Sequence, residues 1–97
     1  MKIARVTGTV TATVKETQLS GQKLLVVDVI DAAGKTLESS VVALDVHGAG
    51  PGDQVLIVTG SAARLPGQTS GIATDATIVA IIDEVTVGGK SVYNASK

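Results

Sequence analysis

The sequence predicts an all-β fold, a small five-stranded barrel in a single domain, and three observations support this prediction. Apolar and polar residues alternate with a period of two along several segments. Glycine-rich turn signals separate these segments. No segment shows the spacing of a long amphipathic helix. A chain of 97 residues has room for one domain of this kind.

The first strand shows the alternation most clearly. Every second residue from Ala4 to Val14 is small or apolar, and the residues between them are polar or charged. This pattern predicts a long strand with one buried face. Residues 16–22 form a polar loop, and Lys23–Ile30 is the predicted hairpin partner.

Both faces of the second strand are apolar. One face carries Leu24, Val26 and Ile30, and the other carries Leu25, Val27 and Val29. The interior of a small barrel accepts one face only, so we expect the row of Leu25, Val27 and Val29 to point outward into a subunit interface. In the alternative, a loop or short helix of the same chain covers that row.

The middle of the chain contains the sharpest turn signal. Residues 31–36 form a turn, and Glu38–Asp45 is the predicted third strand. Gly48–Asp53 then contains three glycines and a proline, which predicts a tight exposed turn with residues at positive φ. The fourth strand is Gln54–Thr59.

The last third of the chain completes the barrel. Gly60–Leu65 is a single helical turn with Ser61 as its N-cap, and residues 68–71 form an open loop. Ala76–Val87 is the fifth and most apolar strand. Residues 1–87 are therefore the predicted domain, a closed or nearly closed barrel of the OB type. The tail 88–97 lacks the pattern and either frays or docks on a neighbouring subunit.

Composition excludes several classes of function. The net charge is −1 with scattered basic residues, and Tyr93 is the only aromatic residue, so a nucleic-acid-binding groove with stacking side chains is not predicted. Cysteine is absent and no apolar run could span a bilayer, which favours a soluble, cytoplasmic protein. A core of small side chains gives a modestly stable monomer, and oligomerisation is a common remedy.

No group of residues predicts catalysis. His47 is the only histidine and lies two residues from Asp45, but neither a nucleophile nor a metal-ligand spacing accompanies the pair. The Gly48–Asp53 turn lacks the lysine and hydroxyl of a phosphate-binding loop. We therefore expect no enzyme activity, metal or cofactor. The physical pattern favours a structural protein or, alternatively, an OB-fold binding module for single-stranded nucleic acid or a small ligand.

Four segments resemble the EutN/CcmL family in order and spacing. They are Met1–Gly8, Gly48–Leu56, Gly60–Arg64 and Asp75–Asp83, which together extend over most of the chain up to Val87. The resemblance implies a five-stranded barrel that forms a cyclic homopentamer and caps the vertices of a bacterial microcompartment shell, in a carboxysome or a metabolosome. Its implied partners are the hexameric and trimeric shell proteins, without nucleic acid or membrane.

The resemblance also implies roles for two segments. Gly60, Ser61, Ala62, Ala63 and Arg64 correspond to a segment near subunit contacts and the axial pore, with Arg64 as a candidate intersubunit contact; the alternative is a turn that covers the barrel end. Gly48, Ala49, Gly50, Pro51, Gly52 and Asp53 correspond to an exposed turn, for which a plain tight turn is favoured over a hexamer contact. Ala62 and His47 depart from the serine and the apolar residue common in the family.

Overall fold

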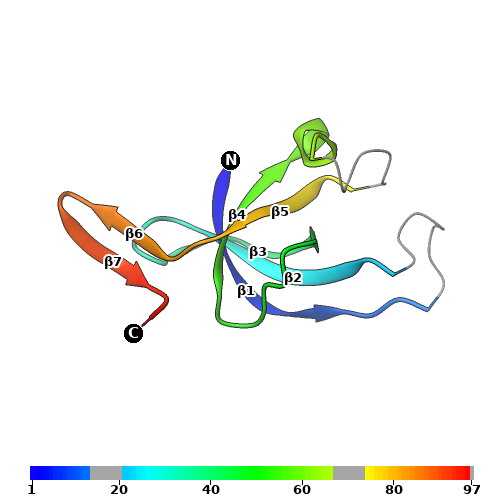
Figure 1. The fold of residues 1–97 in the computed structure, drawn as a ribbon, viewed down its shortest axis with the longest axis horizontal. Coiled ribbons are helices and arrows are strands. Elements are labelled where there is room, and N and C mark those ends of the chain that lie inside the picture. Colours follow the sequence, from blue (N-terminus) through cyan, green and yellow to red (C-terminus); the bar gives the residue numbers. More distant parts are fainter. Residues whose placement is uncertain (14–20, 67–73, 97) are drawn as a thin grey trace.

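A computed structural model of the chain describes residues 1–13, 21–66 and 74–96 (Figure 1). The predicted loop 68–71 and most of the predicted loop 16–22 lie outside the described residues. None of the helices in the described ranges combines the length and hydropathy needed to cross a membrane. In chain order the elements are β1 (Lys2–Val10), β2 (Lys23–Ile30), β3 (Thr36–Asp45), β4 (Gln54–Thr59), the 3₁₀ helix η2 (Gly60–Arg64), β5 (Ala76–Ile81), β6 (Glu84–Val87) and β7 (Lys90–Asn94).

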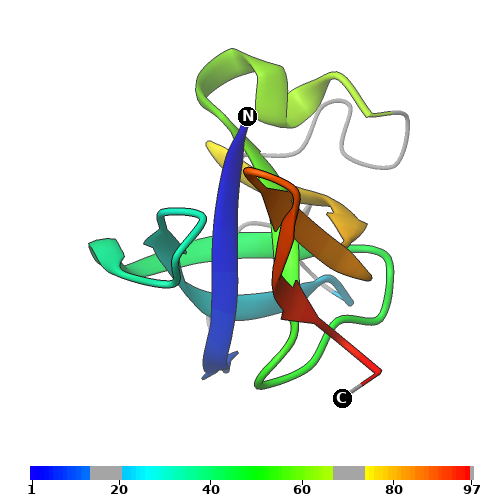
Figure 2. The same ribbon diagram turned by 90° about the vertical axis from the view of Figure 1, so that its left-hand side faces the viewer.

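The first five strands close into a barrel, which confirms the predicted fold class (Figure 2). The order around the barrel is β1-β2-β3-β5-β4, and β1 pairs antiparallel with both β2 and β4. Strands β3 and β5 close the barrel through one paired position in a parallel arrangement, Leu44 with Thr77. The bounds of β2 and β4 match the prediction. Strand β1 ends at Val10, four residues earlier than predicted.

The interior of the barrel is filled by aliphatic side chains from all five strands. The prediction for β2 was wrong about which row points inward. Leu25 and Val27 are fully buried and Val29 is 5% exposed, and all three belong to the core, where Val27 and Val29 pair with Val6 and Ala4 of β1. When both faces of a strand are apolar, its own periodicity does not identify the inner face; pairing with the first strand does.

The opposite row of β2 lies on the outside of the barrel. Leu24 and Val26 are half-buried, and in the pairing with β3 they lie beside Leu44 and Val42. Val42 is 45% exposed. An apolar outer row therefore exists, as the composition of β2 predicted, but it consists of Leu24 and Val26, which had been assigned to the interior, whereas Ile30 of the same row is buried.

Strand β3 changes direction in its first half. Its register against β2 shifts twice, between Val27 and Val29 and between Val29 and Ile30. At the same point Ser40 adopts φ 60°, a conformation that non-glycine residues seldom take, and its amide donates to Asp28 Oδ1 at 3.0 Å. Such irregularities redirect a strand and its side chains. Leu37, 64% exposed, belongs to this redirected part.

The apolar run that was predicted as one fifth strand is divided into two elements. Strand β5 ends at Ile81, and β6 pairs with β7 in a separate two-stranded sheet, the C-terminal hairpin. Gly88 and Gly89, at φ 58° and 80°, form its turn, since a two-residue hairpin turn needs positive φ at both positions. The predicted boundary between domain and tail falls inside this turn, and residues 90–94 are ordered as a strand.

Truncation of one leucine from each row of β2 tests which row lies inside the barrel. Leu25→Ala should lower the free energy of unfolding by about 2–5 kcal/mol, because it opens a cavity in the closed interior. Leu24→Ala removes a half-buried side chain from the outer surface and should cost less than half as much. Chemical denaturation at one fixed protein concentration measures both values. Equal losses for the two variants would contradict the assignment of the inner row.

Candidate functional site

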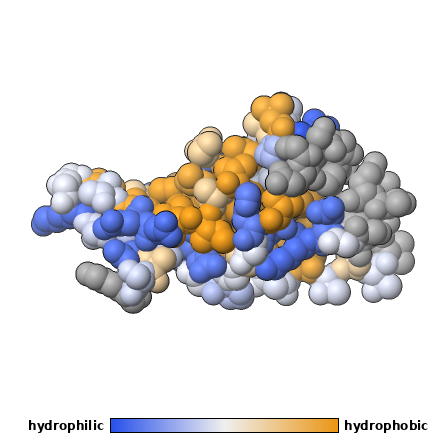
Figure 3. All heavy atoms as spheres, in the orientation of Figure 1, coloured by the Kyte–Doolittle hydropathy of each residue, from blue (hydrophilic) through white to orange (hydrophobic). Residues whose placement is uncertain are grey.

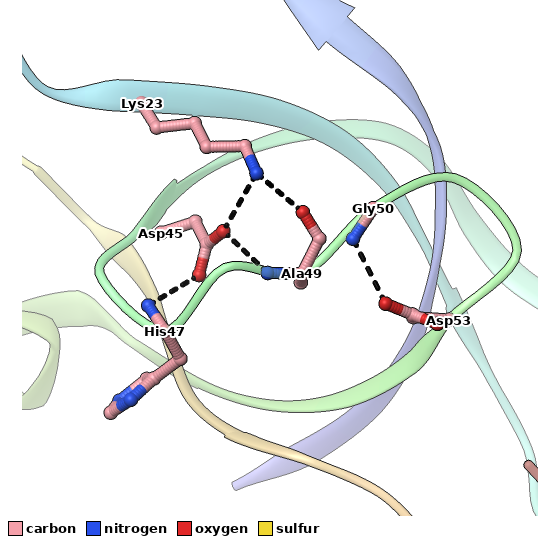
Figure 4. A network of polar contacts seen from close by, with 6 residues as sticks. All are labelled: Lys23, Asp45, His47, Ala49, Gly50 and Asp53. Atoms are coloured by element: carbon pink, nitrogen blue, oxygen red, sulfur yellow. Dashed lines mark hydrogen bonds and ion pairs between the residues drawn. The ribbon is translucent and has the colours of Figure 1, made fainter.

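The predicted tight turn, Gly48–Asp53, is held in place by a buried carboxylate (Figure 4). Asp45, whose side chain is fully buried, accepts hydrogen bonds from the backbone amides of His47 at 2.9 Å and Ala49 at 2.8 Å. Lys23 Nζ lies 3.5 Å from Asp45 Oδ2 and donates to the Ala49 carbonyl at 2.6 Å. The ion pair between Lys23 of β2 and Asp45 of β3 thus binds both the amide and the carbonyl group of Ala49.

The turn is also attached to β1. The amide of Val6 donates to the Asp53 carbonyl and the amide of Gly52 donates to the Val6 carbonyl, both at 2.9 Å. Within the turn, Gly50 N donates to Asp53 Oδ2 at 2.9 Å. Gly48, Pro51 and Gly52 are exposed as predicted, but Ala49 is completely buried and belongs to the core. The segment is therefore a rigid turn with one side chain inserted into the barrel.

Asp45 and His47 do not form an acid–base pair. The imidazole of His47 points away from the Asp45 carboxylate, whose oxygens are occupied by backbone amides (Figure 4). Within the ranges that the structure describes, there is no group of three His, Cys, Asp or Glu side chains placed to hold a metal ion. The chemistry available here is that of a structural clamp.

The segment predicted near the subunit contacts is the 3₁₀ helix η2, which lies beside the ends of β4 and β5 (Figure 1). Its N-cap position is Thr59 and no side chain caps it, so the predicted role of Ser61 as N-cap is wrong. The amide of Gly60 donates to the Asp75 carbonyl at 2.8 Å. Thr77 Oγ1 donates to the Ala63 carbonyl at 2.7 Å, which joins η2 to the strand that closes the barrel.

The side chains of η2 divide into two groups. Ala63 is buried against the barrel and Ala62 is half-buried. Gly60, Ser61 and Arg64 are exposed, and Leu65, directly after the helix, is 81% exposed. The helix thus covers the barrel end with one side and presents a guanidinium, a hydroxyl and a leucine with the other. Leu25, Val27 and Val29, predicted to share this surface, are inside the barrel.

Lys23 and Asp45 were not predicted as a functional pair. A signal was available, since an Asp shortly before a glycine-rich loop often accepts hydrogen bonds from the amides that follow it. The long-range partner Lys23 depends on the pairing of β2 with β3 and gives no signal in the sequence.

Comparisons with known proteins place the whole chain in one group. The family model described as "Ethanolamine utilisation protein EutN/carboxysome" matches residues 1–83. The carboxysome shell vertex protein CcmL of Synechococcus elongatus is 47% identical over 94 residues, which cover 97% of this chain and 95% of the relative. The bacterial microcompartment shell vertex protein EutN of Salmonella typhimurium is 43% identical with the same coverage.

Solved structures of the same group of proteins are also similar to this chain. The structure of CcmL from Gloeobacter violaceus superposes with a TM-score of 0.92 at 39% identity and covers all of both chains. The GrpN pentameric microcompartment shell protein from Rhodospirillum rubrum superposes with a TM-score of 0.79 at 38% identity, covering 90% of this chain and 98% of that one. The similarity includes the C-terminal hairpin as well as the barrel.

The clamp on the tight turn can be tested on its own. Asp45→Ala should lower the free energy of unfolding by about 1–3 kcal/mol, because two amides and one ammonium group lose their common acceptor in a buried place. Hydrogen exchange should show faster exchange of the amides of His47 and Ala49. Asp31→Ala serves as a control, since Asp31 caps an exposed turn through Ala33 N and Lys35 N. An Asp45 variant with unchanged exchange at Ala49 would contradict the clamp.

Proposed function

Because the chain belongs to the EutN/CcmL family of shell vertex proteins, we infer that it is a structural subunit of a bacterial microcompartment shell and forms the pentamers that cap its vertices. It is not an enzyme. The observation that carries this conclusion is similarity over nearly the whole chain, in sequence and in structure, to proteins named for this role.

The surface of the single chain supports self-association. The described residues include several large apolar side chains that are at least one third exposed: Met1, Leu37, Val42, Leu65, Ile81, Val87 and Val92. In Figure 3 apolar residues gather over the middle of the molecule, next to the point where β5 leads into the C-terminal hairpin. Contiguous exposed apolar surface is typical of interfaces. A cyclic ring of identical copies would cover it without leaving open ends.

We propose that η2 lies at the contacts between subunits and near the central axis of the pentamer. Its exposed Ser61 and Arg64 are available to an adjacent copy, and the helix is held to the barrel through Gly60 and Ala63. A guanidinium offers several donors in a fixed plane, which suits contacts to carboxylates or carbonyls across an interface. Five copies of η2 around an axis would line any narrow pore.

The proposed outer partners are the hexameric and trimeric proteins that form the facets of such shells. Flat hexagonal layers do not close, so five-fold points are needed to supply curvature. The Gly48–Asp53 turn is a candidate contact, because Pro51 and Gly52 are exposed while the segment is fixed by Asp45, Lys23 and β1. A rigid exposed turn loses little conformational entropy when it binds.

Binding of single-stranded nucleic acid has less support. The single aromatic residue, Tyr93, is half-buried, and its hydroxyl oxygen accepts a hydrogen bond from the Gln54 amide at 3.4 Å. Its ring is therefore attached to the barrel and is not a free stacking platform.

The oligomeric state tests the proposed function. Native mass spectrometry and sedimentation of the purified chain at micromolar concentration should give a mass five times the 9.7 kDa of one chain. Filter binding of single-stranded DNA at low salt is the control for the alternative and should show no retention. A stable monomer at this concentration would contradict the inference.

Arg64→Ala separates assembly from folding. Because Arg64 is exposed on η2, its truncation should change the free energy of unfolding of the dissociated chain by less than about 0.5 kcal/mol. The dissociation constant of the assembly should rise about tenfold, as for a buried interface arginine. Sedimentation across a dilution series measures the second effect and denaturant titration the first. A variant that unfolds instead of dissociating would place Arg64 outside the interface.

A further inference from the structure

The C-terminal hairpin has one apolar face and one polar face. Val85 pairs with Tyr93 and Val87 with Lys90, and alternation along each strand places Val85 with Val87, and Val92 with Lys90, on one face. The register shift between Val85 and Thr86 brings Tyr93, which pairs with Val85, onto this same face. The other face carries two cross-strand polar pairs, Glu84 with Asn94 and Thr86 with Ser91. A two-stranded hairpin is marginally stable in water, so an apolar face of this kind needs a surface to pack on.

The chain's own barrel accommodates only the half of this face that is near it. Tyr93 reaches β4 through its hydroxyl and Gln54, and the Ala95 amide donates to the Asp83 carbonyl at 2.8 Å. Val85 and Tyr93 are half-buried. The far half of the hairpin extends away from the barrel (Figure 1), and there Val87 is 51% and Val92 45% exposed. Two valines that should be covered are therefore uncovered in the isolated chain.

The barrel has an open groove of matching chemistry, here called the Leu37 groove. It is about 490 Å³ in volume, and its lining includes the apolar side chains of Ile3, Ile30 and Leu37. The charged residues of its lining are Lys2, Asp31 and Glu38, which sum to a net negative charge. The far end of the hairpin carries one charged residue, Lys90, on the same face as Val87. Apolar surface and charge are thus complementary between the two features.

We infer that the far half of the C-terminal hairpin, residues 87–92, packs into the Leu37 groove of a second copy of this chain. Val87 and Val92 cover Leu37 and Ile3, and Lys90 lies beside Glu38. The contact is heterologous, since one feature of a chain meets a different feature of the next, and repetition of such a contact produces a closed ring when the rotation between neighbouring copies closes. This inference rests on the proposed self-association and names the segments that carry it.

Cross-linking tests the contact directly because the chain contains no cysteine. The variant with both Val92→Cys and Leu37→Cys is treated with a short bis-maleimide and run on a denaturing gel. We expect a ladder of covalent products up to five chains. An equal mixture of chains that carry only Val92→Cys with chains that carry only Leu37→Cys should give dimers and nothing larger, because each chain then has one reactive site.

The matched control pairs Val92→Cys with Thr9→Cys. Thr9 is exposed on β1, the strand that contributes Ile3 to the groove, but lies about 20 Å further along it. This control should stay at the mass of one chain on the denaturing gel. If native mass shows five chains and the Val92/Leu37 variant cross-links no more than the control, the hairpin contact is wrong while the proposed function stands. If native mass shows a monomer, both are wrong.

A charge exchange gives a second measurement that does not depend on cysteines. Lys90→Glu and Glu38→Lys should each raise the dissociation constant of the assembly about two- to fivefold, as expected for a partly exposed ion pair. The double variant should return to within about twofold of the original protein. Additive losses in the double variant would overturn the pairing of Lys90 with Glu38.

Discussion

The structure depends on the closure of a barrel so narrow that each strand can turn one row of side chains inward. Ala4 and Val6 from β1, Leu25 and Val27 from β2, and Ile57 from β4 are among the buried side chains of its core. Apolar side chains for which this interior has no room lie outside, as Leu37 and Val42 do. Closure itself is weakest between β3 and β5, which share the single pair Leu44 and Thr77, and there η2 adds a hydrogen bond from Thr77 to Ala63. The short helix is thus part of the barrel's closure.

Because the interior is narrow, the surface contains two kinds of segment. One is fixed by hydrogen bonds within the chain, and the other keeps exposed apolar side chains. The Gly48–Asp53 turn is held by hydrogen bonds with Asp45, Lys23 and β1, and the buried side chain of Ala49 packs in the core. The C-terminal hairpin is different, because Val87 and Val92, in the far half of its apolar face, are 51% and 45% exposed. A segment that is fixed by its own hydrogen bonds can present a constant shape to a partner. A segment with exposed apolar side chains is stabilised when a partner covers them.

The sequence predicts the barrel well because period-two alternation and glycine-rich turns are local signals. The bounds of β2 and β4 follow from them directly. The inner row of β2 does not, since Leu24 and Leu25 are equally apolar and only pairing with β1 decides between them. The C-terminal hairpin was obscured by the apolar run through Ile81, Ile82 and Val85, although Gly88-Gly89 is a recognised two-residue turn signal. The Lys23–Asp45 clamp joins residues 22 positions apart and exists only in the fold.

The amino-acid composition of this chain links the stability of its fold to its assembly. A core without phenylalanine or tryptophan buries less apolar area per residue than an aromatic one, so the isolated barrel has a small margin of stability. Contacts that exist only between folded copies add to that margin by mass action. A closed ring uses both sides of a heterologous contact in every copy, so the apolar surface displaced from the narrow interior is covered without leaving an end at which further copies could add. The geometry that limits the core thus also supplies the apolar surface that such a ring covers.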